Sequence, residues 1–233
     1  MKTICVIQHT EAEYLGLLED HLEGRNIRFH YKRPFTSGGT LPASAEGYDG
    51  LMLLGGGPYG VVSGHILPSL GHELRLTRAF LSAGLPVVGF ELGAVLLSIA
   101  AGGGAEEAPL RFTLESAQAT GAGRLGGQMP EVFPLACYLR DAPALPAEAT
   151  ILARGQDGAP LVFGIGDNSL GFLGHPGMKR GMAEDLIMEF ADTPEDCATP
   201  LQALAVAQGE IAEVLSGLMV GLAAHTGWME EMA

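Results

Sequence analysis

The sequence predicts an α/β protein of three layers, with a mostly parallel central sheet, helices on both faces and a carboxyl-terminal helical extension. Short apolar runs alternate with amphipathic segments, a pattern typical of βαβ units. Hydrophobic residues make up 47% of the 233 residues and charged residues 17%, so a large core can form. Glycine clusters at 55–57 and 89–93 follow predicted strands, at the sheet edge where functional groups collect.

The first half of the chain contains the clearest strand and helix patterns. The predicted strands cover residues 3–8, 27–31, 50–54 and 86–89. The predicted helices cover residues 11–24, 70–83 and 93–101. The first of these helices has Leu15, Leu18 and Leu22 on one stripe and ends at a glycine. Residues 33–47 are rich in Pro, Gly and Ser and are expected to form a loop.

The segment from 103 to 160 changes character, because glycine, alanine and proline dominate it. We expect a mostly antiparallel edge region there, with short strands at 131–139 and 150–153. Residues 161–165 and 169–173 are predicted to form a hairpin, since Gly166-Asp167-Asn168 between them is a favourable turn.

The last 45 or so residues are predicted to be helical. One helix is expected at 181–191, and Thr193-Pro194 and Thr199-Pro200 each resemble a capping residue before a first-turn proline. The final helix carries an apolar stripe at three-and-four spacing, formed by Ile211, Val214, Leu215, Leu218, Met219 and Leu222. We expect an α/β domain at 1–190 and a helical extension at 191–233 packed on it. The alternative for the stripe is a homodimer seam.

Charge and cysteine content limit the classes of function. The 13 Lys+Arg against 27 Asp+Glu give a net charge of −14, which disfavours nucleic acid and membrane surfaces as partners. The amino terminus is too weakly apolar for a signal peptide, and the three cysteines form no CxxC pair. We therefore expect a cytoplasmic protein without a metal. The glycine run at 55–60 has no following Lys-Ser/Thr, so no nucleotide cofactor is expected either.

The segment Gly89-Phe90-Glu91-Leu92-Gly93 is the most informative in the chain. It joins a short apolar strand to an apolar helix, and a glycine two residues to either side allows a sharp turn. Such a turn normally presents a nucleophile, whereas here it presents the carboxylate of Glu91. Backbone N–H groups at the start of the helix are expected to favour the charged form of that carboxylate.

Three segments, in order along the chain, resemble the class I glutamine amidotransferase family. Tyr48–Pro58 is similar to the family's strand and Gly-Gly-Pro turn. Pro86–Gly93, continuing to Gly102-Gly103, is similar to its nucleophile elbow and helix. Gly171–Pro176 is similar to its histidine-proline motif. The resemblance implies a flavodoxin-like, class I glutamine amidotransferase-like fold.

The resemblance also implies a site. In that family an elbow cysteine attacks the side-chain amide of glutamine, a histidine moves the proton, and a glutamate two residues further on orients the imidazole. Residue by residue, the resemblance assigns the elbow position to Glu91 and the base to His175. It assigns the oxyanion-binding turn to Gly56 and Gly57, with the amides of Gly57 and Leu92 as donors.

The departures from the family pattern concern the same mechanism. Glu91 replaces the cysteine, Gly177 replaces the orienting glutamate, and Val95 stands where the family usually has a glutamine. Attack by a carboxylate on an unactivated amide would give an anhydride-like intermediate that collapses back. We therefore expect a pseudoenzyme that has lost cysteine-dependent glutamine hydrolysis. It would be retained as a binding or regulatory subunit, and its partner would be a separate synthetase or acceptor subunit.

Two further hypotheses concern the Glu91 and His175 side chains. They are expected to form an ion pair or acid/base pair in the cleft, since a carboxylate stabilises a protonated imidazole. The plain alternative is a hydrogen bond that merely fills a disused pocket. In the alternative function, the protein is an active hydrolase or transferase of altered chemistry that uses Glu91 and His175 on a non-amide substrate.

Overall fold

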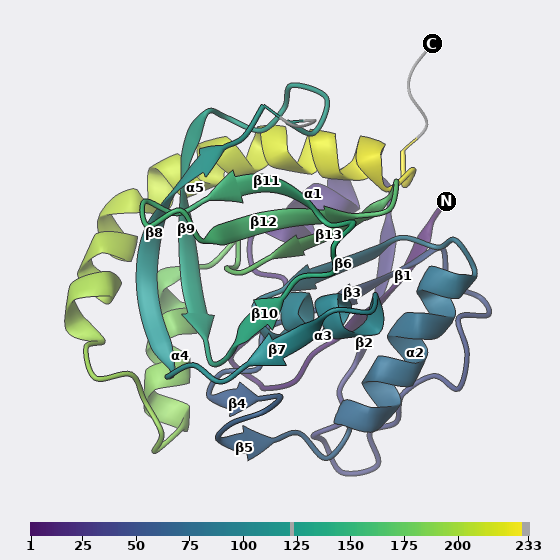
Figure 1. The fold of residues 1–233 in the computed structure, drawn as a ribbon, viewed down its shortest axis with the longest axis horizontal. Coiled ribbons are helices and arrows are strands. Elements are labelled where there is room, and N and C mark those ends of the chain that lie inside the picture. The colour runs from purple at the N-terminus through teal and green to yellow at the C-terminus, as the bar shows by residue number, and fades with distance from the viewer. Residues whose placement is uncertain (122–123, 230–233) are drawn as a thin grey trace.

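A computed structural model describes residues 1–121 and 124–229. Its central sheet has the strand order β2-β1-β3-β6-β13-β12-β11-β8-β9. The strands β2, β1, β3, β6 and β13 pair in parallel, and the ladders from β13 onward to β9 are antiparallel. The predicted α/β fold is therefore confirmed, with a parallel half next to an antiparallel half (Figure 1).

The parallel half follows the predicted order of elements. Its strands are β1 (Thr3–Ile7), β2 (Arg28–Lys32), β3 (Gly50–Leu53), β6 (Val87–Phe90) and β13 (Ser169–Phe172). The antiparallel half contains β8 (Arg111–Ala119), β9 (Val132–Leu139), β11 (Thr150–Arg154) and β12 (Pro160–Ile165). Two small two-stranded sheets are formed by β4 (Tyr59–Gly60) with β5 (His65–Ile66), and by β7 (Gly104–Glu106) with β10 (Ala142–Ala144).

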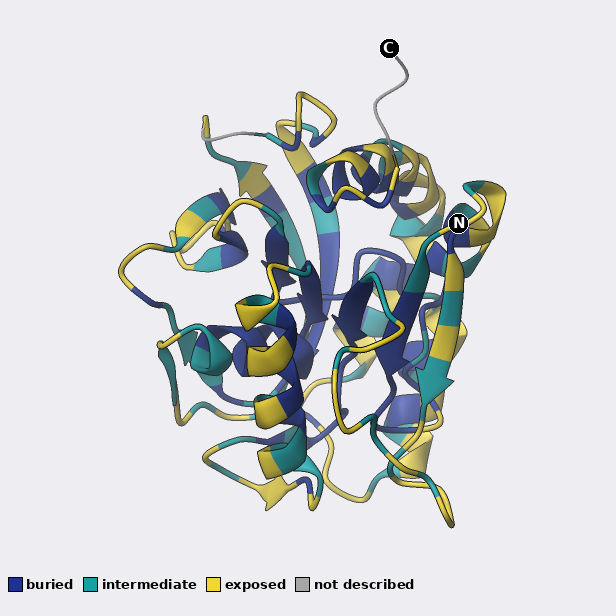
Figure 2. Ribbon diagram, turned by 90° about the vertical axis from the view of Figure 1, so that its right-hand side faces the viewer, coloured by how far each residue is buried: buried dark blue, intermediate teal, exposed yellow. Residues whose placement is uncertain are grey.

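Helices cover both faces of the sheet and complete the three layers. The helices are α1 (Leu18–Gly24), α2 (Leu70–Ser82), α3 (Leu92–Ala100), α4 (Arg180–Glu189) and α5 (Ala198–His225). On one face α2 packs against α3, and both contact β3 and β6. On the other face α5 contacts α1, α4, β8 and β9. Figure 2 shows the central strands largely dark blue between these layers, with exposed residues on the outer sides of the helices.

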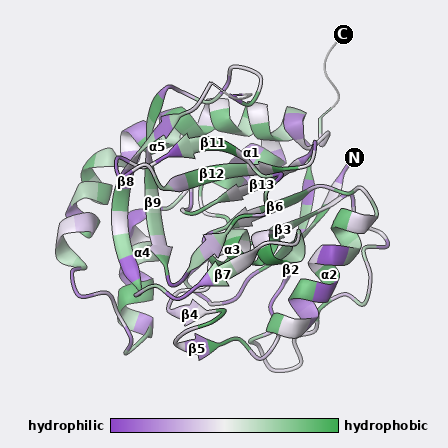
Figure 3. Ribbon diagram, in the orientation of Figure 1, coloured by the Kyte–Doolittle hydropathy of each residue, from purple (hydrophilic) through white to green (hydrophobic). Residues whose placement is uncertain are grey.

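The parallel core is apolar because both of its faces are covered. Every residue of β3 and β6 is buried, as are Leu92 to Ser98 of α3. Figure 3 shows α3 largely in green, whereas the outer side of α2 carries hydrophilic residues. From β1 the chain continues to β2, which lies on one side of β1 in the sheet. From β3 it continues to β6, which lies on the opposite side. The carboxyl ends of β1 and β3 thus flank a topological switch point, where sites form in such sheets.

The carboxyl-terminal helix packs on its own chain. Ile211, Leu215, Leu218, Met219 and Leu222 of the predicted stripe are buried, and α5 crosses β8 and β9 (Figure 1). By length and composition, α5 is the one helix in the described ranges that could cross a membrane. The stripe that suggested a homodimer seam is therefore used inside the protein. Residues 230–233 of the predicted extension lie outside the described ranges.

Three predicted helix boundaries are wrong. The final helix begins at Ala198 with Cys197 at the cap position, so Thr193-Pro194 and Thr199-Pro200 do not cap helices. The first helix begins at Leu18 instead of residue 11. Gly16, in the left-handed region with φ 63°, breaks the helical pattern and turns residues 11–17 into a loop. This loop lies against the predicted site.

Candidate active site

Glu91 lies on a sharp bend between β6 and α3, as the sequence predicts. Its backbone has φ 52° and ψ −115°, a strained conformation for a residue with a side chain, and it caps α3. The bend needs glycines nearby because a Cβ on Gly89 would clash with the Gly93 carbonyl, and one on Gly93 with the Leu53 carbonyl. The Glu91 N–H donates to the Phe172 carbonyl at 2.7 Å, which fixes the elbow to β13.

The Glu91 carboxyl group is fully buried and faces Glu13. Its Oε1 accepts a hydrogen bond from the Tyr138 N–H at 2.6 Å. Its Oε2 and the Oε1 of Glu13 both border the position that a Gly55 side chain would take, and the two side chains interact by a hydrogen bond. Neither oxygen has another partner in the described residues. Two acceptor oxygens can share such a contact only through a proton.

The protonation of Glu91 differs from the expectation. Burial, followed by the charge and hydrogen bond of Glu13, raises its pKa well above the ordinary value, and the Tyr138 N–H only partly opposes this shift. The expectation that helix N–H groups keep Glu91 charged is therefore wrong. A neighbouring carboxylate in a dry environment outweighs a helix terminus.

Glu13 is the residue that sequence reasoning missed. Its Oε2 accepts a hydrogen bond from the Gly57 N–H, and its own N–H donates to Thr10 Oγ1 at 3.1 Å. The side chain is fully buried. The Gly57 amide is the donor that the family resemblance assigns to the oxyanion hole, so Glu13 occupies that position. A glycine inside the predicted helix at residue 16 was the one signal that residues 11–17 leave the helical path.

His175 also lies at this end of the strands, and its ring nitrogens bind backbone groups instead of Glu91. Its Nε2 donates to the Tyr14 carbonyl at 2.9 Å, and its Nδ1 accepts from the Gly177 N–H at 3.1 Å. The ring stacks on Phe90 with centroids 5.4 Å apart. Burial lowers its pKa to about 4, so the ring is neutral near pH 7.

The predicted Glu91–His175 ion pair is therefore wrong. No ion pair or hydrogen bond joins the two side chains within residues 1–121 and 124–229. Both nitrogens of the uncharged imidazole are already bound to backbone groups, so the ring has no free donor for the Glu91 carboxyl group. The roles predicted for Glu91 and His175 in catalysis stay predictions.

The other predicted positions surround the same site. Leu92 lies over Gly56, because a Cβ on Gly56 would clash with the Leu92 side chain. At the position of the orienting glutamate, a Cβ on Gly177 would clash with Cδ1 of Leu18. The Gly177 carbonyl accepts a hydrogen bond from the Leu17 N–H at 3.1 Å. The space beside His175 is thus filled by the loop that follows β1 and by the start of α1.

A second buried pair supports the loop. His9, directly after β1, places Nε2 2.8 Å from Oε2 of Glu73 on α2, and its Nδ1 lies 2.9 Å from the Gly55 carbonyl. Burial disfavours the charge on His9, but the charge and hydrogen bond of Glu73 outweigh it and raise the pKa. The imidazolium therefore contributes a positive charge next to Glu13.

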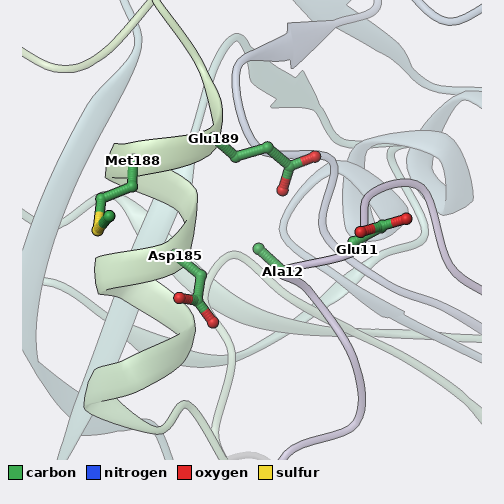
Figure 4. Close-up of a pocket in the computed structure, with 5 residues that line it drawn as sticks. All are labelled: Glu11, Ala12, Asp185, Met188 and Glu189. Carbon is green, nitrogen blue, oxygen red and sulfur yellow. The ribbon is translucent and has the colours of Figure 1, made fainter.

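The surface outside the loop is acidic. A hollow of about 490 Å³ is lined by Glu11, Ala12, Asp185, Met188 and Glu189. Figure 4 shows the carboxyl groups of Asp185 and Glu189 extending from α4 toward Ala12. Within the described ranges, no three His, Cys, Asp or Glu side chains are placed to hold a metal ion.

Comparison with known proteins identifies the fold. The chain has a TM-score of 0.81 to a glutamine amidotransferase from Methylobacillus flagellatus, at 22% identity over 97% of this chain and 95% of that one. The fold is that of the glutamine amidotransferases. A glutamine amidotransferase from Thermotoga maritima has a TM-score of 0.79 at 20% identity, over 97% of this chain and 98% of that one.

A more distant structure is described as part of a larger enzyme. It is a putative GMP synthase subunit from Thermoplasma acidophilum, with a TM-score of 0.58 and 16% identity over 90% of this chain and 98% of that one. No protein-family model matches the sequence, and no curated protein matches it. At these identities the comparisons establish the fold, and the activity depends on the site.

Proposed function

We propose that this glutamine amidotransferase-like protein does not hydrolyse glutamine by cysteine chemistry and is retained as a binding or regulatory subunit. The observation that supports this most strongly is the elbow itself. A buried carboxyl group stands where the fold presents a nucleophile, and its two oxygens are engaged by Tyr138 and Glu13. A protonated carboxyl group is a poor nucleophile, and burial keeps glutamine away from it.

The residues around Glu91 support the same conclusion. A base must reach the proton that it moves, whereas both nitrogens of His175 are bound to backbone groups. No nearby thiol replaces the missing one: burial raises the pKa of Cys5 to about 12 and raises that of Cys137 as well. Such thiols stay protonated and unreactive near pH 7.

The proposed partner is a separate synthetase or acceptor subunit. The similarity in fold to a protein described as belonging to a synthase favours this assignment. The apolar stripe of α5 is buried on its own chain, so it does not favour a second copy of the protein as the partner.

One observation favours the alternative of altered chemistry. Two carboxyl groups that interact directly, Glu13 and Glu91, are an arrangement that can give and accept protons. The altered enzyme would therefore use Glu91 with Glu13, since His175 is not its partner. We expect the wild-type protein and Glu91→Ala to show the same background rate on simple esters, and a rate lost in Glu91→Ala would favour the enzyme.

The test of the leading proposal measures ammonia release from glutamine. We expect no release above that of Glu91→Ala, because the site has no thiolate and no free base. Glu91→Cys is expected to stay inactive as well, since Leu18 fills the place of the orienting glutamate at Gly177. Ammonia release by the wild-type protein would overturn the proposal. Release by Glu91→Cys alone would show that the elbow residue is the only loss.

A further inference from the structure

The buried loop after β1 brings a glutamate into the position where the fold binds a carbonyl oxygen of its substrate. Glu13 Oε2 accepts the Gly57 N–H, and the carboxyl group lies beside the elbow residue, Glu91. A glutamate side chain is also what remains when the side-chain amide of glutamine is hydrolysed. Glu13 thus places at the Gly57 N–H the same kind of carboxyl group that hydrolysis of glutamine would produce.

Backbone hydrogen bonds hold the loop that carries Glu13. Its N–H donates to Thr10 Oγ1, the Leu15 N–H donates to the Tyr31 hydroxyl at 2.9 Å, and the Leu17 N–H donates to the Gly177 carbonyl. Gly16 takes a left-handed conformation, and a Cβ there would clash with the Gly177 carbonyl. The bonds of Leu15 and Leu17 attach this loop to β2 and to the backbone after His175.

The two carboxyl groups require one proton between them. Glu13 Oε1 and Glu91 Oε2 are both buried, and apart from each other neither has a hydrogen-bond partner within the described ranges. Two ionised carboxylates that face each other in a buried site would repel strongly. Two protonated groups would leave the Gly57 and Tyr138 N–H groups with weaker, uncharged acceptors.

We propose that Glu13 is an internal ligand of the oxyanion position, locked there by a single proton that it shares with Glu91. The proposal adds regulation to the function proposed above and rests on that function only in the assignment of Gly57 as the oxyanion donor. The shared proton keeps residues 10–17 in the site. Loss of the proton leaves two facing negative charges and releases the loop.

Other charged groups around the pair set the pH range of this change. His9, in the loop after β1, and Glu189 of α4 act on Glu13, and Arg111 of β8 acts on Glu91. Cys137 and Tyr138 of β9 also face the pair, and Glu73 of α2 acts on it only through His9. Burial raises the pKa of Glu13, and its hydrogen bonds and protonated His9 oppose this rise; Arg111 opposes the rise in the pKa of Glu91. Both cations act in favour of one negative charge on the pair.

Counting protons during unfolding tests the shared proton. Near pH 7 the folded pair holds one proton and the unfolded chain holds none, so unfolding of the wild-type protein releases one more proton than unfolding of Glu91→Gln. The ratio of their unfolding constants then changes about tenfold per pH unit from pH 6 to pH 7. Glu184→Gln, in an exposed ion pair with Arg180, serves as the control and follows the wild-type protein. Equal proton release in the wild-type protein and Glu91→Gln overturns the proposal.

Removal of the internal ligand gives a second, independent measurement. Glu13→Ala is expected to gain melting temperature in acetate buffer relative to chloride at equal ionic strength and pH, because acetate restores a carboxylate to the Gly57 N–H. The wild-type protein is expected to show no such gain, and equal gains in both overturn the internal-ligand assignment. If Glu13→Ala does not fold, Glu13→Gln replaces it in the acetate comparison, and the proton count of the wild-type protein against Glu91→Gln does not depend on either variant. Ammonia release by the wild-type protein would contradict the proposed function and leave these two measurements unaffected.

Discussion

His9 and Glu73 form an ion pair inside the protein, with Nε2 and Oε2 2.8 Å apart and neither side chain exposed to solvent. The pair connects the end of β1 to α2 and so holds the first residues of the loop that carries Glu13. The pKa of His9 is raised and that of Glu73 is lowered, in each case because the partner's charge outweighs burial. The pair therefore stops contributing to stability when pH rises through the pKa of His9 in the folded protein, and also when pH falls through that of Glu73.

Removal of one member of this pair is expected to destabilise the protein strongly. Glu73→Ala leaves an unpaired buried imidazolium and should lower the free energy of unfolding by about 3–5 kcal/mol. Glu184→Ala removes the exposed ion pair with Arg180 and should change it by less than about 1 kcal/mol. Urea unfolding at pH 7 measures both. Similar losses in the two variants would show that His9 is not charged.

The elbow is expected to tolerate no side chain at Gly93. Gly93→Ala pushes a Cβ into the Leu53 carbonyl and should cost about 1–3 kcal/mol or more. Gly181 occupies the same place in the first turn of α4 and has open space around it. Gly181→Ala should therefore stabilise the protein by about 0.5–1 kcal/mol. Thermal unfolding of the two variants compares them, and equal effects would mean that the bend is looser than described.

His175 is expected to make the protein less stable in acid. Its pKa is about 4 in the folded state against 6.5 for an ordinary histidine, so the unfolded chain binds more protons between these values. Stability attributable to this residue is complete above pH 6.5 and is lost as pH falls toward 4.

The matched comparison is His175→Gln, which cannot titrate. The free energy of unfolding of the wild-type protein minus that of His175→Gln should fall by about 2 kcal/mol between pH 7 and pH 5. Glu91, with its raised pKa, shifts stability in the opposite direction but does so in both proteins. A difference that stays constant with pH would mean that His175 is accessible to solvent or already charged.

The final helix is expected to owe its stability to packing on its own chain. Leu215→Ala creates a cavity against the sheet and should cost about 2–5 kcal/mol at any protein concentration. Val206→Ala, on the same helix but 83% exposed, should change stability by less than about 0.5 kcal/mol. Denaturant unfolding at two protein concentrations measures both. A concentration-dependent midpoint would point to a dimer instead.

Much of the fold could be predicted because its signals are local. Apolar runs placed β1, β3 and β6 within a residue or two, and the glycines around Glu91 predicted the bend. The long strand β8 was missed, because its few apolar residues are spread among polar ones and most of the strand is only half-buried. Glu91, His175, Gly57 and Gly177 lie at the carboxyl ends of the parallel strands, whereas the sequence placed Glu13 on a helix that begins only at Leu18.

The sequence by itself determined that the elbow presents an acid in an α/β fold, because the residue type and the flanking glycines are adjacent in the chain. Only the tertiary structure decided which group that acid faces. Glu13 and Glu91 are 78 positions apart, and their contact depends on how a loop after β1 folds against β6, which no local pattern encodes. Burial and this contact raise the pKa of Glu91, whereas burial lowers the pKa of His175 to about 4 without any contribution from the pair.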